Sequence, residues 1–184
     1  FTMPIYTKRG DRGETGLPGG KRLSKAEVLF EVLGSLDQTN AAIGLAVSFL
    51  TNQPEITTEL IAVQAALFNI GAYLADPNQQ SKQLLFLEDL TNKMEHSIDQ
   101  WEKETGSLEH FIIPGGAPEG ASLQLARSIS RLAERQYHRL PTTHHRPEIS
   151  QYLNRLSDFL FQAARVVNFR SGNLENQWLS TPNN

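Results

Sequence analysis

The stretch Glu148-Ile-Ser-Gln-Tyr-Leu-Asn-Arg-Leu-Ser-Asp-Phe-Leu-Phe-Gln-Ala-Ala-Arg-Val-Val-Asn-Phe169 decides the fold class. Its apolar residues recur at steps of three and four, which is the spacing of one face of an α-helix. They are Tyr152, Leu153, Leu156, Leu160, Ala163, Ala164 and Val167. The sequence therefore predicts a helix over about 148–169 with one face in a hydrophobic core.

Four other segments share this periodicity and predict helices over about 25–49, 57–75, 84–105 and 118–140. We expect their inward-facing residues to be Val28, Leu29, Val32, Leu33, Leu36, Ile43 and Val47, then Leu60, Ile61, Val63, Ala66, Leu67, Ile70 and Leu74, then Leu87, Leu90, Met94, Ile98 and Trp101, and then Leu123, Ala126, Ile129, Leu132, Ala133 and Tyr137. No alternating strand pattern is visible. The sequence predicts an all-α bundle of five helices with antiparallel neighbours.

The composition is that of one globular domain with an ordinary charge balance. The chain has 184 residues, of which 39% are hydrophobic, and a formal net charge of −3. A general nucleic-acid binder normally carries a basic excess, so we expect no nucleic-acid partner. Without cysteine or a run of 18 apolar residues, we expect neither disulfides nor a membrane span. We expect a cytoplasmic protein, although an opening Phe1 leaves room for a targeting segment removed before it.

A glycine-rich basic segment precedes the first helix: Tyr6-Thr-Lys-Arg-Gly-Asp-Arg-Gly-Glu-Thr-Gly-Leu-Pro-Gly-Gly-Lys-Arg-Leu-Ser-Lys25. Glycines let backbone N–H groups converge on an anion, and lysine, arginine and threonine add donors for phosphate oxygens. The segment suits a polyphosphate cradle, although its composition also fits a flexible basic arm. The Walker spacing is absent, so phosphate would bind in another way. We expect a single domain over 1–184, with this arm at 1–24, the bundle at 25–170 and a C-terminal tail at 171–184.

Polar residues on the predicted fourth and fifth helices form a second candidate site. Arg127, Arg131, Glu134 and Arg135 lie at helical steps and make one polar stripe. Three arginines against one glutamate leave positive charge for an anion, and Asn154 could hydrogen-bond a base or a ribose. A solvated helix face with salt bridges is the alternative. The histidines have no ligand spacing with carboxylates and no nucleophile motif appears, so we expect no metal site made by protein side chains.

Four motifs occur in order along the chain: Tyr6-Thr-Lys-Arg-Gly-Asp-Arg-Gly-Glu-Thr-Gly-Leu17, Phe111-Ile-Ile-Pro-Gly-Gly116, Ala126-Arg-Ser-Ile-Ser-Arg-Leu-Ala-Glu-Arg135 and Tyr152-Leu-Asn-Arg-Leu-Ser-Asp158. Together they resemble the PduO-type ATP:cob(I)alamin adenosyltransferases. The resemblance implies a ferritin-like five-helix bundle that forms a homotrimer, with active sites between neighbouring subunits. It also implies that the 5′-deoxyadenosyl group of MgATP is transferred to the cobalt of cob(I)alamin, giving adenosylcobalamin and triphosphate.

The resemblance further implies roles for individual residues. In the arm, the nucleotide would be contacted by Thr7, Lys8, Arg9, Gly10, Asp11, Gly13, Thr15 and Lys25. From the helices it would be contacted by Arg131, Glu134, Arg135 and Asn154. Arg127 would pair with Asp37 across the subunit interface, and Phe111 would press on the lower face of the corrin. Arg131, Asp37, Arg127 and Phe111 are the residues expected to be catalytic, and ATP, Mg²⁺ and cobalamin are the expected cofactors and substrates.

Two departures from the family pattern are visible. Gln38-Thr39 stands where the family often has Glu-Leu, which puts contacts by those two positions in doubt. Leu132 stands where an arginine is usual and removes one positive charge near the stripe. Neither change touches Asp37 or Arg131.

Two other functions also fit the residues. A kinase or nucleotidase would use the same cradle but would cleave between phosphates. A non-catalytic trimeric module would bind or deliver nucleotide or corrinoid without turnover. For the adenosyltransferase itself, the partners expected are a cob(II)alamin reductase and an adenosylcobalamin-dependent enzyme.

Overall fold

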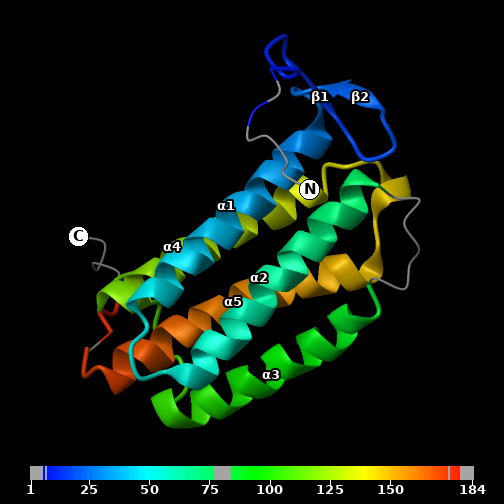
Figure 1. The fold of residues 1–184 in the computed structure, drawn as a ribbon. Helices are drawn as coiled ribbons and strands as arrows, with labels where there is room; N and C mark the ends of the chain where they lie inside the picture. The colour runs from blue at the N-terminus through cyan, green and yellow to red at the C-terminus, as the bar shows by residue number, and fades with distance from the viewer. Residues whose placement is uncertain (1–5, 7, 77–83, 174, 179–184) are drawn as a thin grey trace, which may run out of the picture.

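A computed structural model describes residues 6, 8–76, 84–173 and 175–178. These residues contain five α-helices: α1 (Val28–Phe49), α2 (Pro54–Ala75), α3 (Phe86–Thr105), α4 (Pro118–Tyr137) and α5 (Pro147–Arg170) (Figure 1). The all-α five-helix prediction is confirmed. The expected starts of α2 and α5 lie slightly too late, because Pro54 and Pro147 occupy the first helical turn, where the missing N–H of proline costs nothing.

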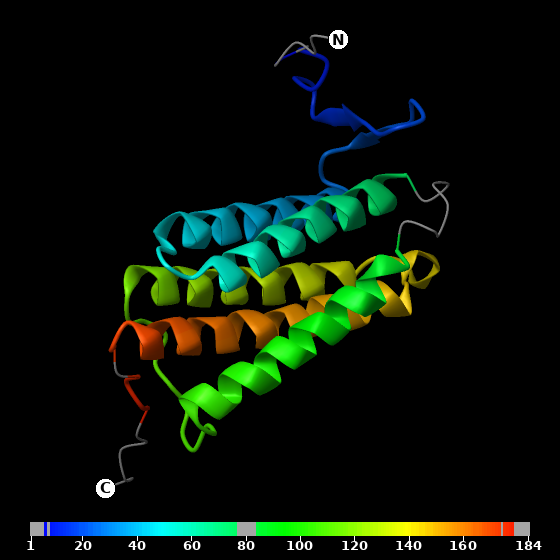
Figure 2. The same ribbon diagram turned by 60° about the horizontal axis from the view of Figure 1, so that its bottom comes forward.

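The helices form two layers, with α3 added on the outer side of α5 (Figure 2). α1 packs against both α2 and α4, α4 packs against α5, and α5 packs against α3. The start of α1, the end of α4 and the start of α5 lie at one end of the bundle (Figures 1 and 2). The N-terminal arm is attached at this same end.

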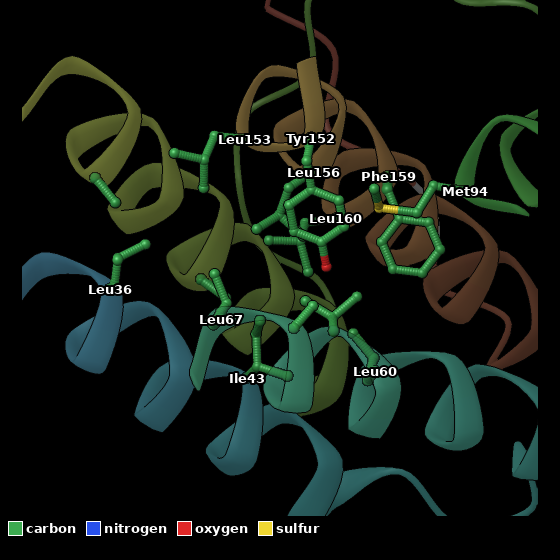
Figure 3. Packing of buried hydrophobic residues seen from close by; sticks show 14 of the residues in the cluster. Leu36, Ile43, Leu60, Leu67, Met94, Tyr152, Leu153, Leu156, Phe159 and Leu160 are labelled. Carbon is green, nitrogen blue, oxygen red and sulfur yellow. The ribbon is translucent and has the colours of Figure 1, made fainter. Parts of the chain in front are cut away.

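The centre of the core is α5, because it has neighbours on more than one side. Fourteen of its 24 residues are buried. Figure 3 shows Leu156 and Leu160 of α5 facing side chains of α1 and α2, and Phe159 lying beside Met94 of α3. Burying side chains of this size contributes about 1.5–3 kcal/mol each, so α5 holds both layers together.

One buried polar group stands out in this core. The Tyr152 hydroxyl points from α5 towards α2 (Figure 3) and has no hydrogen-bond partner among the described residues. Complete burial raises the pKa of this phenol, because the charged form would lose its hydration. Tyr152 therefore stays neutral and acts as a large apolar filler.

Most of the expected inward-facing residues are buried or packed against the core, but the prediction for Ile61 is wrong. Ile61 is 54% exposed and lies on the outer surface of α2. Leu45, Phe49 and Phe68 of α1 and α2 are exposed as well. α1 and α2 carry apolar residues both where they contact the other helices and on their exposed surfaces. Periodicity alone could not separate the buried apolar residues from the exposed ones.

The structure adds a small β-hairpin that the sequence analysis did not predict. β1 (Glu14–Gly16) and β2 (Arg22–Ser24) pair antiparallel, with Thr15 opposite Leu23. Between them, Gly19 and Gly20 have φ values of +86° and +84°, which side chains rarely tolerate. The strands have only three residues each, too few for an alternating pattern, and the turn glycines are what form the hairpin.

By length and hydropathy alone, α2 could cross a membrane. A helix in the core of a helical bundle can have the same length and hydropathy. Ile56, Leu60, Leu67 and Ile70 of α2 are fully or almost fully buried against the other helices.

The Asn168 side chain anchors the start of α4 to the end of α5. Its Oδ1 accepts a hydrogen bond from Ala117 N at 3.0 Å, and its Nδ2 donates to Gly115 O at 3.0 Å. A methyl group on Gly116 or Gly120 would overlap this side chain, and Gly116 also has a φ of +102°. Close approach therefore requires glycine at both positions.

We predict that Gly120→Ala lowers the free energy of unfolding by about 2 kcal/mol, because the added methyl displaces Asn168 and leaves buried groups without partners. Chemical denaturation followed by circular dichroism measures this change. Gly34→Ala is the matched control, since nothing lies within 4 Å of the added methyl and helix propensity should raise stability by about 0.5–1 kcal/mol. Equal stability of the two variants would contradict the role of Asn168.

Candidate functional site

The arm folds into a compact turn that places basic groups together. Lys8 has a φ of +57°, an uncommon conformation for a residue with a side chain. Gly13 N donates to Gly10 O at 3.3 Å, and Lys25 N donates to Gly13 O at 2.8 Å. A methyl group on Gly10 would lie 3.2 Å from Lys25 Nζ, so the Lys25 ammonium rests against this glycine. The backbone turn and the Lys25 ammonium thus meet at Gly10.

Arg22 ties this turn to the hairpin. Its Nη2 donates to Arg9 O at 2.7 Å, and its Nε pairs with Glu14 at 3.3 Å. Thr15 is half-buried within the hairpin, while Asp11 and Gly13 are exposed beside the turn. Thr7, which was expected to contact the nucleotide, lies outside the described residues. Hydrogen bonds within the arm and the pairing of β1 with β2 therefore fix the backbone of the described arm residues.

The second group of predicted residues lies where α4 ends and α5 begins. Arg131 and Arg135 are exposed on the last turns of α4, with Glu134 half-buried between them. Asn154 is exposed near the start of α5, the helix packed beside α4. Within the described part of the chain, neither arginine forms a salt bridge. Their positive charge is therefore not neutralised by protein carboxylates.

The arm and the α4–α5 residues share one end of the bundle but do not meet within a single chain. Figure 2 shows the hairpin projecting beyond α1, on the side away from α4 and α5. The hydrogen bonds found for described residues 8–25 are all made within the arm and the start of α1. A ligand touching both groups would need the arm to move or a second chain to supply one of them.

Arg127 and Asp37 do not pair with each other in the described part of the chain. Arg127 is half-buried, donates from Nε to Gln124 Oε1 at 2.8 Å and lies 5.8 Å from the centre of the Phe161 ring. Burial, and then the charge of Arg131, lower the pKa of Arg127. Asp37 is exposed in an apolar hollow between α1 and α2, beside Phe68. Among the described residues neither is in a salt bridge.

Phe111 lies at the opposite end of the bundle from the arm. Its ring is 76% exposed, and its segment is attached through Asn168 to the last turns of α5. A helix rises 1.5 Å per residue, so Asn168 is about 21 Å along α5 from Asn154. Within one chain, the Phe111 segment and the candidate nucleotide-binding residues therefore lie at different positions along the axis of the bundle.

Sequence reasoning missed the residues that hold Phe111 in place. Trp178 lies edge-on to the Phe111 ring, with 6.4 Å between ring centres, and its backbone N donates to Phe111 O at 2.6 Å. Arg165 and Asn168 are buried polar residues of α5, 4% and 5% exposed. Polar residues at otherwise apolar helix positions were a usable signal. No comparable pattern in the sequence indicated that the tail pairs with the Phe111 segment.

Comparisons with known proteins agree on one family. A family model described as cobalamin adenosyltransferase matches residues 5–167. A corrinoid adenosyltransferase from Bacillus subtilis is 42% identical over 174 residues, which cover 92% of this chain and 89% of that protein. One from Citrobacter freundii is 37% identical over 166 residues, 88% of this chain and 93% of that protein.

A solved structure shows the same fold. It is a variant PduO-type ATP:corrinoid adenosyltransferase from Lactobacillus reuteri, complexed with cobalamin and ATP. The TM-score is 0.89 at 30% sequence identity, over 96% of this chain and 97% of that one. The extent of the family match and the shared fold place this chain in the cobalamin adenosyltransferase family.

Proposed function

We propose that this chain is an ATP:corrinoid adenosyltransferase that transfers the 5′-deoxyadenosyl group of ATP to the cobalt of cob(I)alamin. The electron pair of Co(I) attacks the ribose 5′ carbon, a Co–C bond forms, the C5′–O bond breaks and triphosphate leaves. The observation that carries this proposal is the pair of exposed arginines, Arg131 and Arg135, with no salt bridge among the described residues. The negative charge of the leaving triphosphate would balance these two arginines, which no described carboxylate pairs with.

The protein needs no nucleophile of its own for this reaction. Cob(I)alamin is itself the nucleophile, so the chain has to position the two substrates and stabilise the leaving group. We assign Lys8, Arg9, Gly10 and Lys25 to the phosphates, because Lys8 and Arg9 are exposed on this backbone turn and the Lys25 ammonium lies beside Gly10. Asp11, Gly13 and Thr15 shape this turn, and Thr7 is assigned to the same role by its position next to Lys8.

On the helices, Arg131 would carry the largest electrostatic role, since its charge lies where triphosphate would develop. Arg135 and Glu134 flank it, and Asn154 from α5 can hydrogen-bond the ribose or the base. The described residues hold no group of three His, Asp or Glu side chains able to bind a metal ion. This fits Mg²⁺ that arrives bound to the ATP phosphates, where it needs few protein ligands.

We propose that the site is completed between copies of the chain in a homotrimer. Three observations support a second copy: the arm projects away from α4 and α5, the Phe111 segment is bound to Asn168, which lies about 21 Å along α5 from Asn154, and Asp37 and Arg127 have no salt bridge within the described chain. The exposed apolar residues of α1 and α2 offer a surface for such contacts. An Asp37–Arg127 pair between subunits would then neutralise the half-buried Arg127.

We assign Phe111 to the lower face of the corrin. A large exposed apolar ring can cover this face, exclude water and displace the lower axial ligand, which makes Co(II) easier to reduce. The cell would also need a cob(II)alamin reductase to supply Co(I) and an adenosylcobalamin-dependent enzyme to use the product, and we place the reaction in the cytoplasm. A non-catalytic nucleotide or corrinoid carrier is the alternative, and turnover distinguishes the two.

We predict that Arg131→Ala lowers kcat/KM by about 100-fold or more, because a preorganised charge on the leaving group is lost. The assay is anaerobic, with MgATP and chemically reduced cob(I)alamin, and follows both the Co(I) absorbance and intact triphosphate. Arg139→Ala is the control, since Arg139 lies just beyond α4 and its hydrogen bonds among the described residues go to Gln136. A near-normal rate for Arg131→Ala would contradict its role. With the unmodified protein, ADP and a phosphorylated acceptor would favour a kinase, and orthophosphate or pyrophosphate would favour a nucleotidase.

We predict that Phe111→Ala reduces the fraction of bound Co(II) lacking its lower ligand at least about tenfold and leaves the Kd for ATP within about twofold, because Phe111 is remote from the nucleotide groups. Optical and electron paramagnetic resonance spectra of bound cob(II)alamin measure the first quantity. Phe169→Ala is the control, an exposed aromatic residue at the same end of the bundle. Unchanged Co(II) spectra would contradict the role of Phe111.

A further inference from the structure

We propose that Arg165, through its pair with Glu175, is a positioning residue for Phe111: it anchors the C-terminal segment that holds Phe111 towards the corrin. This inference rests on the proposed role of Phe111. Arg165 itself is not in contact with Phe111, and it acts through residues 175–178.

Arg165 is the most deeply buried member of the salt bridges found among the described residues. Its side chain is 4% exposed, and its Nε lies 2.9 Å from Glu175 Oε1. Its Nη1 donates to Gly106 O at 3.1 Å and to Gln162 Oε1 at 3.3 Å. A buried guanidinium without a carboxylate is strongly disfavoured. The Arg165 charge therefore holds Glu175, and with it the tail, against the end of α5.

The anchored tail pairs with the segment that carries Phe111. Ile113 N donates to Asn176 O at 2.7 Å, and Trp178 N donates to Phe111 O at 2.6 Å. These two bonds lie on either side of a bridge between Ile112 and Gln177. The Phe111 segment gains a short antiparallel partner that its own sequence neighbours do not provide.

Phe111 is consequently held from two directions. Asn168 fixes the turn that follows it, and the tail fixes its backbone and places the Trp178 ring edge-on to it. Both sets of interactions start from the last turns of α5, where Arg165 and Asn168 are buried. An aromatic ring that is 76% exposed has otherwise little to restrict it. Restricting it before the corrin binds reduces the ordering cost of the bound state.

The first test measures anchoring without any substrate. Glu175→Gln removes the charge that Arg165 pairs with, and we expect hydrogen exchange at the amides of Ile113 and Trp178 to become about tenfold faster or more. Glu104→Gln is the matched control, because Glu104 pairs with Arg170, further along α5, and has no hydrogen bond or salt bridge with the described tail residues 175–178. Unchanged exchange in Glu175→Gln overturns the proposal, whatever the reaction of the protein proves to be.

The second test asks whether anchoring reaches Phe111. Glu175→Gln should reduce the fraction of bound Co(II) without its lower ligand at least fivefold and leave the Kd for ATP unchanged. Trp178→Ala should do the same while leaving the buried Arg165–Glu175 pair intact, so loss of folding cannot explain the result. Fast exchange with normal Co(II) spectra would overturn the positioning role. Absence of adenosyl transfer in the unmodified protein would instead contradict the proposed function and leave the exchange result standing.

Discussion

Burial of α5 between α3 and the layer formed by α1 and α2 is the constraint on which the rest of the structure depends. Most of its length is covered by α4 on one side, α3 on another and core side chains of α1 and α2. Such a helix has few positions for polar groups, and each buried one needs a partner. Gln162 finds its partner at the end of α3, Arg165 in the tail, and Asn168 in the loop before α4. The core helix thereby also orders the segment that presents Phe111.

The arginines of α5 and those of α4 differ in whether they are paired with carboxylates. The three arginines of α5, Arg155, Arg165 and Arg170, all form salt bridges with carboxylates. The three arginines of α4 form none within the described residues. Burial first, and the charge of Arg131 second, lower the pKa of Arg127, so part of this shift is repulsion between like charges in the ligand-free protein. An anionic ligand removes that repulsion, which links the arrangement of α4 to triphosphate.

The sequence was informative where a physical pattern repeats and uninformative where contacts are made between distant segments. Helical periodicity predicted all five helices, because a buried face has to recur every three or four residues. It could not show that Ile61 is exposed, since an apolar residue on the surface of a helix and one in the core fit the same spacing. The hairpin at Gly19 and Gly20 was missed because strands of three residues have no readable period.

The candidate site shows the same division. Lys8, Arg131 and Phe111 were identified from motifs, and their exposure agrees with a role in binding. That the arm projects away from α4 depends on the angle at which the hairpin leaves α1, and no local sequence pattern sets this angle. The pairing of Trp178 with Phe111 joins residues 67 positions apart, and it depends on the buried Arg165.

The central claim is that adenosyl transfer takes place at a site made by the arm of one chain and the α4–α5 surface of another. Mixed assemblies test it most directly, using Lys25→Ala and Arg131→Ala chains that are each inactive alone. Trimers reassembled from equal amounts should regain about a quarter of the normal activity, because that fraction of interfaces joins an intact arm to an intact α4. Mixed assemblies with no more activity than either variant alone would contradict the account.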